Sequence, residues 1–229
     1  MGIADNLVSV HTRIASAARA GGRDPRDIRL LAVSKMQSPQ RVLEAASAGQ
    51  RDFGENYLQE ALDKQIAVAN PALTWHFIGP IQSNKTRAIA EHFAWVHSVD
   101  RIKIAQRLSD QRPIHLPALN ICIEINISGE ASKSGIAPPA LLAFARQVAA
   151  LPRLKLRGLM AIPAPTVDVQ QQRLTFARVR ELLETLNQQG LALDTLSMGM
   201  SDDMEAAIAE GATIVRIGTA IFGARPALK

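Results

Sequence analysis

The sequence predicts a (β/α)8 TIM barrel, an α/β fold, with one extra helix before the first strand. Three observations predict it. Eight short apolar runs alternate with helical patterns along 229 residues, and this alternation is typical of a parallel sheet. Eight repeats in a chain of this length fit a barrel. The repeats occupy the chain without a Ser- or Gly-rich linker, so we expect a single domain over residues 1–229.

A doubly wound open sheet is the alternative fold. Such a sheet usually carries a Gly-rich turn after its first strand, where a dinucleotide binds. The segment "AVSKMQSP" that ends the first apolar run contains no glycine. The sequence therefore favours the barrel.

The elements follow one another in a regular order. Residues 1–20 form an amphipathic pattern with Ile3, Leu7, Val10 and Ile14 on one side, which predicts the leading helix. The expected strands are 28–35, 51–56, 74–80, 94–99, 118–127, 155–163, 194–200 and 212–223. The helices singled out between them are 38–49, 83–92, 101–111, 137–151, 169–190 and 202–211.

Start and stop signals support several of these helices. Ser38 followed by proline begins one helix, and Gly49, Gly190 and Gly211 end others. Asp202, with a glutamate three residues later, resembles a capping box.

Composition narrows the classes of function. The net charge is +5, but the 26 Lys and Arg residues are scattered and aromatic residues make up only 4%. That pattern argues against nucleic acid as the main partner. The single cysteine, Cys122, excludes an intramolecular disulfide and fits a cytoplasmic location. We find no secretory signal and no apolar run of membrane-spanning length, so we expect no membrane partner.

Lys35 ends the first apolar run, "IRLLAVSK". It is either a solvated residue at the end of a strand or a group directed into a site. Alternation along the strand places Lys35 on the same face as Val33 and Leu31. Barrel sites form at the carboxyl ends of the strands, so this lysine can reach the mouth of the barrel. A lysine in such a place can form a Schiff base.

The last two strands end in segments suited to phosphate, "SMGMSDD" and "RIGTAIFG". Barrels often bind phosphate there on backbone N–H groups. Gly199, Gly218 and Gly223 permit close backbone approach, and Ser201 and Thr219 can donate hydroxyl hydrogen bonds. Ser201 can instead cap a helix. Asp202 and its neighbouring aspartate would repel a phosphate unless they point away from it.

Arg216 shares its face of the last strand with Ile214 and Gly218. An arginine inside a barrel needs an acceptor. Glu124 on the fifth strand is one candidate, and a ligand atom is another. Lysine, phosphate-binding segments and inward arginine together suggest pyridoxal 5′-phosphate. The five histidines lack the spacing of metal ligands, so we expect no metal.

The sequence closely resembles the pyridoxal phosphate homeostasis protein family. The segments that carry the resemblance are "LLAVSK", "FGENYLQEALDK", "WHFIGPIQSNK", "NISGEASKSG", "LRGLMAIP" and "LSMGMSDDMEAAIAEGATIVRIGTAIFG", in this order. The resemblance implies a fold like the barrel domain of alanine racemase, without that enzyme's second domain. It also implies that pyridoxal 5′-phosphate is the cofactor.

The resemblance assigns roles to individual residues. Lys35 matches the lysine that holds the cofactor as a Schiff base, and Arg216 matches the arginine near its pyridine nitrogen. The phosphate-binding positions and their flank match Met200, Ser201, Gly218 and Thr219. Asn56 matches a residue near the ring oxygen. His76 and Met160 are further candidates for the pocket wall, and His76 is equally interpretable as a hydrogen-bonded core residue.

Three functions remain open at this point. The first, which the resemblance favours, is a non-catalytic carrier that holds pyridoxal phosphate reversibly, with cofactor-dependent apoenzymes as partners and a monomeric state. The second is a racemase or lyase of low activity, in which Tyr57, the only tyrosine, would have to supply the second acid–base group. The third is a barrel that binds an unrelated phosphorylated metabolite or nucleic acid, with Lys35 acting only as a charge.

Overall fold

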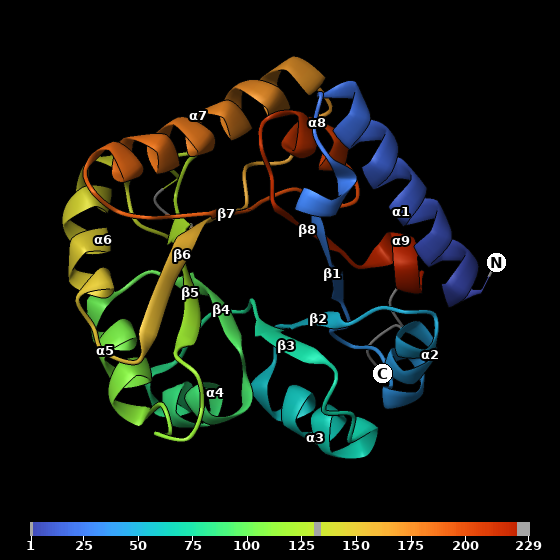
Figure 1. Cartoon of the computed structure of the whole chain (residues 1–229), viewed down its shortest axis with the longest axis horizontal. Helices are drawn as coiled ribbons and strands as arrows, with labels where there is room; N and C mark the ends of the chain where they lie inside the picture. The colour runs from blue at the N-terminus through green and yellow to red at the C-terminus, as the bar shows by residue number, and fades with distance from the viewer. Residues whose placement is uncertain (1, 131–133, 224–229) are drawn as a thin grey trace.

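Eight parallel strands close into a barrel in the order β1 to β8, which confirms the predicted fold (Figure 1). The computed structural model describes residues 2–130 and 134–223. The strand β1 pairs with both β2 and β8 and so closes the sheet. The strands are β1 (Arg29–Val33), β2 (Asp52–Glu55), β3 (Thr74–Phe77), β4 (Trp95–Val99), β5 (Leu119–Ile125), β6 (Leu154–Ala161), β7 (Thr195–Ser197) and β8 (Ile214–Ile217).

Helices surround the barrel and connect its strands (Figure 1). The α-helices are α1 (Ile3–Ala20), α2 (Pro39–Ser47), α3 (Leu58–Val68), α4 (Thr86–His92), α5 (Ile102–Gln111), α6 (Leu141–Ala149), α7 (Val169–Gln188), α8 (Met204–Ala209) and α9 (Thr219–Phe222). Short 3-10 turns lie at η1 (Pro25–Asp27), η2 (Ser83–Lys85) and η3 (Pro138–Ala140). That residues 1–229 form a single domain stays a prediction.

The extra helix before the first strand is α1, as expected. Its buried face comprises Ile3, Leu7, Val10, Ile14 and Ala18, which recur at helical spacing. This face packs against α2, α8 and α9. The leading helix therefore covers the seam where the two ends of the barrel meet (Figure 1).

The structure differs from the sequence prediction at one expected strand and at one helix. The run 212–223 is not one strand, because the chain turns at Gly218 and continues as the short helix α9. The carbonyl of Gly218 accepts from the N–H groups of Ile221 and Phe222, which closes that turn of helix. The helix α3, which follows β2, is absent from the helical segments singled out in the sequence.

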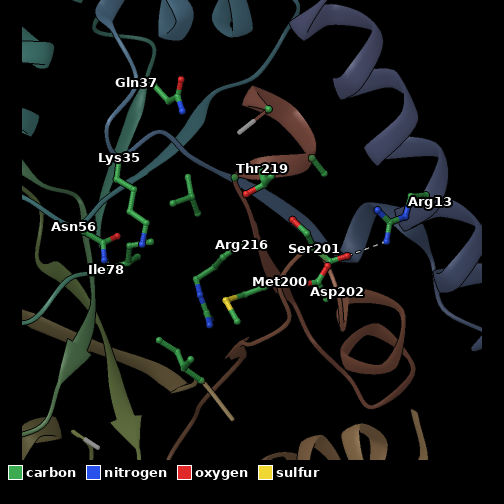
Figure 2. Close-up of a pocket in the computed structure, with 15 residues that line it drawn as sticks. Arg13, Lys35, Gln37, Asn56, Ile78, Met200, Ser201, Asp202, Arg216 and Thr219 are labelled. Atoms are coloured by element: carbon green, nitrogen blue, oxygen red, sulfur yellow. Dashed lines mark hydrogen bonds between the residues drawn. The ribbon is translucent and has the colours of Figure 1, made fainter. Parts of the chain in front are cut away.

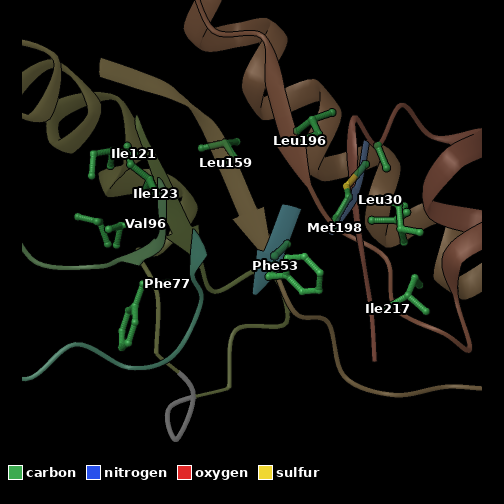
Figure 3. Packing of buried hydrophobic residues seen from close by; sticks show 14 of the residues in the cluster. Leu30, Phe53, Phe77, Val96, Ile121, Ile123, Leu159, Leu196, Met198 and Ile217 are labelled. Carbon is green, nitrogen blue, oxygen red and sulfur yellow. The ribbon is translucent and has the colours of Figure 1, made fainter. Parts of the chain in front are cut away.

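The apolar core has two parts. The larger part lies between the sheet and the helices and includes the residues of Figure 3, such as Leu30, Phe53, Ile121 and Leu196. The smaller part comprises Leu31, Trp95, Cys122, Met160 and Ile214. Leu30 and Leu31 are neighbours in β1 and belong to different parts, as alternation along a strand requires. The smaller cluster therefore fills the barrel interior.

Gly79 shows why a particular small residue stands at the mouth of the barrel. A Cβ atom at Gly79 would overlap the backbone carbonyl of Asn56. The chain after β3 thus passes directly against the chain after β2. Ser98 Oγ donates to the Gly79 carbonyl at 2.5 Å and ties β4 to the same place. This close contact fixes the position of Asn56 at the rim.

Candidate functional site

A cavity of about 530 Å³ opens at the carboxyl ends of the strands. Figure 2 shows Lys35 and Asn56 on one side of it, Ser201 and Thr219 on the other, and Arg216 between them. The residues expected at the site from the sequence all line this one cavity: Lys35, Asn56, Met200, Ser201, Arg216, Gly218 and Thr219. The structure brings them together from β1, β2, β7 and β8. Their roles toward a ligand stay a prediction.

The segment that carries Lys35 is a tight turn after β1. The residue that follows it, Met36, has a φ of 62°, a left-handed conformation that is uncommon for a residue with a side chain. The Met36 N–H donates to Glu60 Oε1 at 2.5 Å, and the Gln37 N–H donates to the Ser34 carbonyl at 3.0 Å. Hydrogen bonds to Glu60 on α3 and to the Ser34 carbonyl therefore stabilise the turn.

The anchor of this turn is a buried lysine, Lys64 on α3. Lys64 Nζ donates to the Ser34 carbonyl at 2.7 Å, to Glu55 Oε1 at 2.6 Å and to Glu60 Oε1 at 2.9 Å. Ser34 Oγ donates to the same Glu55 oxygen at 2.6 Å. Burial raises the pKa of Glu55, and the charge of Lys64 opposes that rise. This buried ion cluster fixes the position from which Lys35 enters the cavity.

Arg216 lies inside the barrel on the face that alternation predicts, and it is only 4% exposed. Its Nη1 donates to the Ser197 carbonyl at 2.5 Å and to Ser197 Oγ at 2.9 Å, and its Nη2 donates to the Ala161 carbonyl at 3.0 Å. These acceptors replace Glu124, the candidate from the sequence. Burial lowers the pKa of Arg216 to about 10, so it stays charged near neutral pH.

The opposite wall is built from the turns after β7 and β8. Gly199 has a φ of 93°, which favours glycine, and an added Cβ would lie 2.6 Å from Ala207 Cβ. Thr219 is the first residue of α9, where backbone N–H groups lack helical partners. The hydroxyls of Ser201 and Thr219 thus stand beside backbone donors on one side of the cavity (Figure 2).

Arg13, which comes from α1, is a cavity residue that no sequence pattern indicates. Its Nη2 donates to the Ser201 carbonyl at 3.1 Å (dashed in Figure 2), and its guanidinium pairs with Glu205 at 2.8 Å. Arg13 also lines the cavity. No local signal distinguishes this arginine from other charged residues on a surface helix. Gln37 is a second omission, although it lies two residues after Lys35 and alternation could have found it.

The capping box proposed at Asp202 is wrong. The helix α8 begins at Met204, with Asp203 before it and no side-chain capping bond. Asp203 Oδ1 instead accepts from the Met200 N–H at 2.6 Å, because the turn after β7 needs that acceptor. Burial raises the pKa of Asp203, so it bears its negative charge less readily than an exposed aspartate. Asp202 lines the cavity.

Other candidates lie away from the cavity. His76 and Met160 are buried inside the barrel and do not line it, so His76 is the hydrogen-bonded core residue of the alternative interpretation. Tyr57 is 54% exposed and precedes α3, also outside the lining. Cys122 is buried in β5, and burial raises its pKa to about 12. No cluster of metal-ligating side chains occurs among the described residues.

The sequence matches one family model and is similar to proteins of known families. The model of the family "Alanine racemase, N-terminal domain" matches residues 13–226. The pyridoxal phosphate homeostasis protein of Pseudomonas aeruginosa is 66% identical over 223 residues, which cover 97% of this chain and 96% of that protein. Its counterpart in Escherichia coli K12 is 55% identical over 228 residues, with 97% of each chain covered.

Solved structures of related proteins have the same barrel fold. PipY of Synechococcus elongatus, determined with pyridoxal phosphate bound, is 38% identical with a TM-score of 0.86 over 96% of this chain and all of that one. Alanine racemase of Corynebacterium glutamicum is 18% identical with a TM-score of 0.70, and the match covers all of this chain and 65% of the enzyme. The latter likeness concerns the fold alone. Within residues 2–130 and 134–223, no helix is long and apolar enough to cross a membrane.

The ion cluster around Lys64 leads to a stability prediction. Lys64→Met should lower the free energy of unfolding by about 3–5 kcal/mol, because it leaves the buried Glu55 carboxylate without its partner. The double variant Lys64→Met/Glu55→Gln should recover part of that loss. Denaturant unfolding measures both, and Lys103→Met, at an exposed position on α5, is the control. A Lys64→Met variant as stable as the wild type would contradict the anchoring role.

Glu124 leads to a pH prediction. Burial raises its pKa from 4.5 to about 7. The folded state therefore binds more protons than the unfolded state between these values, and stability falls as pH rises through this window. Glu124→Gln should be more stable than the wild type at pH 8 by roughly 1–3 kcal/mol, with the advantage lost at pH 4–5.

Thermal or denaturant unfolding across this pH range checks the prediction. Glu181→Gln, on the exposed side of α7, controls for the change in net charge. A pH-independent difference between Glu124→Gln and the wild type would show that the Glu124 carboxyl does not titrate in this window.

Proposed function

We propose, since this chain belongs to the alanine racemase N-terminal domain family and to the pyridoxal phosphate homeostasis proteins, that it binds pyridoxal 5′-phosphate in the cavity. The observation that carries the proposal is the meeting of Lys35, Arg216 and the hydroxyls of Ser201 and Thr219 around one cavity. Lys35 supplies the amine for a reversible Schiff base with the aldehyde of the cofactor.

The residues present fit this group. The cavity has a volume within the usual range for small-molecule sites. Its lining includes Asn56 and Gln37, whose buried carbonyl oxygens have no hydrogen-bond partner among the described residues. A polar ligand would satisfy such atoms. The cation of Arg216 and the hydroxyl side of the cavity suit a ligand that carries phosphate.

Each side of the cavity has a separate task. Ser201, Thr219 and nearby backbone N–H groups bind the phosphate, and Arg13 holds the Ser201 turn in place. The ion cluster of Lys64 orients the turn that carries Lys35. Asn56, which also lines the cavity, is the residue that the resemblance assigns to a contact with the ring oxygen. These are functions of binding and orientation.

We further propose that the protein is a carrier without substantial catalytic activity. When bound, pyridoxal phosphate supplies an electrophilic aldehyde and an electron-withdrawing ring. Arg216 keeps a positive charge in the cavity, which disfavours a second one on the ring nitrogen and so weakens the ring as an electron sink. Tyr57, the candidate for a second acid–base group, lies outside the lining. These features favour a lysine that binds the cofactor over one that acts in catalysis.

The setting of this carrier is part of the proposal. Cofactor-dependent apoenzymes are its expected recipients. The name of the relatives, pyridoxal phosphate homeostasis protein, supports the broader role in cofactor homeostasis. The single buried cysteine fits a cytoplasmic location. The monomeric state stays a prediction.

The cofactor proposal is tested by an absorption spectrum of the protein with pyridoxal phosphate, before and after borohydride reduction. We expect a visible band that reduction bleaches, and mass spectrometry should place the pyridoxyl group on Lys35. Lys35→Ala should lose the band but keep its circular-dichroism melt, because the residue lies in a turn beyond the end of β1. Lys155→Ala, at the opposite end of the barrel, is the control.

The outcomes separate the three functions. A colourless wild-type protein without an adduct would overturn the proposal in favour of an unrelated phosphorylated ligand. Exchange of amino-acid Cα–H for deuterium above the level of free cofactor, lost in Lys35→Ala, would establish the racemase or lyase instead of the carrier.

The phosphate contacts have their own prediction. Ser201→Ala and Thr219→Ala should each weaken pyridoxal phosphate binding by about 1.5–3 kcal/mol, because each removes a hydrogen bond to a charged group. A spectrophotometric titration measures the dissociation constant. Thr185→Ala removes a hydroxyl on α7 that bonds only its own helix, and it should bind normally. Unchanged binding in both Ser201→Ala and Thr219→Ala would place the phosphate elsewhere.

A further inference from the structure

Five polar side chains form a continuous hydrogen-bonded chain through the barrel interior. Asp52 Oδ1 lies 3.0 Å from His76 Nε2, and His76 Nδ1 lies 2.9 Å from His97 Nε2. His97 Nδ1 lies 2.8 Å from Ser197 Oγ, which accepts from Arg216 Nη1 at 2.9 Å. The residues belong to β2, β3, β4, β7 and β8. This interior chain runs from the amino end of β2 to the cavity.

The two ends of the interior chain determine the direction of every bond in it. The carboxylate oxygen of Asp52 is the acceptor of its bond with His76, so His76 donates from Nε2, and a neutral His76 then accepts at Nδ1. His97 must therefore donate from Nε2 and accept at Nδ1. Ser197 then donates its hydroxyl hydrogen to His97, and its lone pairs face Arg216, which only donates. With both histidines neutral, a single arrangement satisfies all four bonds.

Burial enforces this arrangement. His76, His97 and Ser197 are each 0% exposed. Burial lowers the pKa of both histidines, well below the ordinary value for His97, so both are neutral near pH 7. Trp95 stacks on His76 with ring centroids 5.4 Å apart and planes 10° from parallel, which restricts rotation of the imidazole. The links of the chain have little freedom to reorient.

Ser197 is the link that acts on the site. If its hydroxyl hydrogen turned toward Arg216, two donors would meet. Because the Ser197 hydroxyl donates its hydrogen bond to His97, its lone pairs face Arg216 Nη1. The Ser197 carbonyl and the Ala161 carbonyl are the other acceptors of the guanidinium. Three of the five N–H groups of the guanidinium are thereby used on protein acceptors. Arg216 also lines the cavity.

We propose that Asp52, His76, His97 and Ser197 are positioning residues, which hold Arg216 in one orientation at the cavity through fixed histidine tautomers. The proposal rests on the proposed function, in that Arg216 acts on pyridoxal phosphate. It adds a control of the site from the far end of the barrel, because Asp52 begins β2 and does not line the cavity. If the network only satisfied buried polar groups, its removal would not change how tightly the ligand binds.

The first test is ¹⁵N NMR of the histidine side chains in the full chain without added cofactor. We expect His76 and His97 to be neutral at pH 7, each with its proton on Nε2. A proton on Nδ1 of either residue, or a charged imidazole, overturns the directed chain. This measurement is independent of pyridoxal phosphate, so a wild type that fails to take up the cofactor refutes the proposed function and leaves the tautomer result to stand.

The second test compares Ser197→Ala with Ser109→Ala in a pyridoxal phosphate titration. Both remove one buried hydroxyl, but Ser109 lies on α5 and donates to the Pro152 carbonyl outside the interior chain. We expect Ser197→Ala to weaken binding roughly two- to thirtyfold and to shift the His97 Nδ1 signal toward that of an unbonded nitrogen. Ser109→Ala should match the wild type in both.

A circular-dichroism melt confirms that each variant is folded at the temperature of the titration. Folded Ser197→Ala with wild-type affinity would overturn the positioning role, because Arg216 would then need no directed acceptor. Equal weakening in Ser109→Ala would overturn it as well, since the effect would follow lost stability rather than the interior chain.

Discussion

The pairing of β1 with β8 is the constraint on which the site depends. Leu31 lies opposite Arg216 and Ala32 opposite Ile217, so the two ends of the chain form one seam of the barrel. The turn after β1 and the turn after β8 then emerge side by side at the same rim. A Cβ at Gly218 would already lie 3.2 Å from the Val33 carbonyl. Closure of the sheet, rather than proximity in sequence, brings Lys35 to the same cavity as Ser201 and Thr219.

Two buried polar networks hold the functional groups that this seam brings together. The cluster of Lys64 lies behind the turn that carries Lys35, and the interior chain lies behind Arg216. Buried charges are costly in a protein interior, and apolar substitutes often stabilise as well or better. The hydrogen bonds of both networks fix the orientation of the groups that they contact. Preorganised contacts of this kind reduce the cost of ordering a site when its ligand binds.

The sequence predicts the local part of this design and not the rest. Strand number, strand order and the inward faces of Lys35 and Arg216 follow from patterns of period two and from alternation. The acceptors of Arg216 do not, because Ser197 and Ala161 reach it only through the register of the closed sheet. Arg13 meets the Ser201 turn by helix packing, which no local motif encodes. The predicted capping box at Asp202 does not form, and the neighbouring Asp203 carboxylate accepts from the Met200 N–H instead.

The charge at Arg216 bears on the proposed carrier role, because it would limit the chemistry of a pyridoxal phosphate bound in the cavity. Its hydrogen-bond acceptors are neutral carbonyls and a hydroxyl. The charges of Asp203 and Glu124 raise its pKa against the larger effect of burial. With a pKa of about 10, Arg216 remains a cation at neutral pH. A carboxylate at this place would stabilise a protonated ring and promote electron withdrawal, whereas a fixed cation opposes it. In the proposed carrier, one buried guanidinium would thus favour retention of the cofactor over turnover.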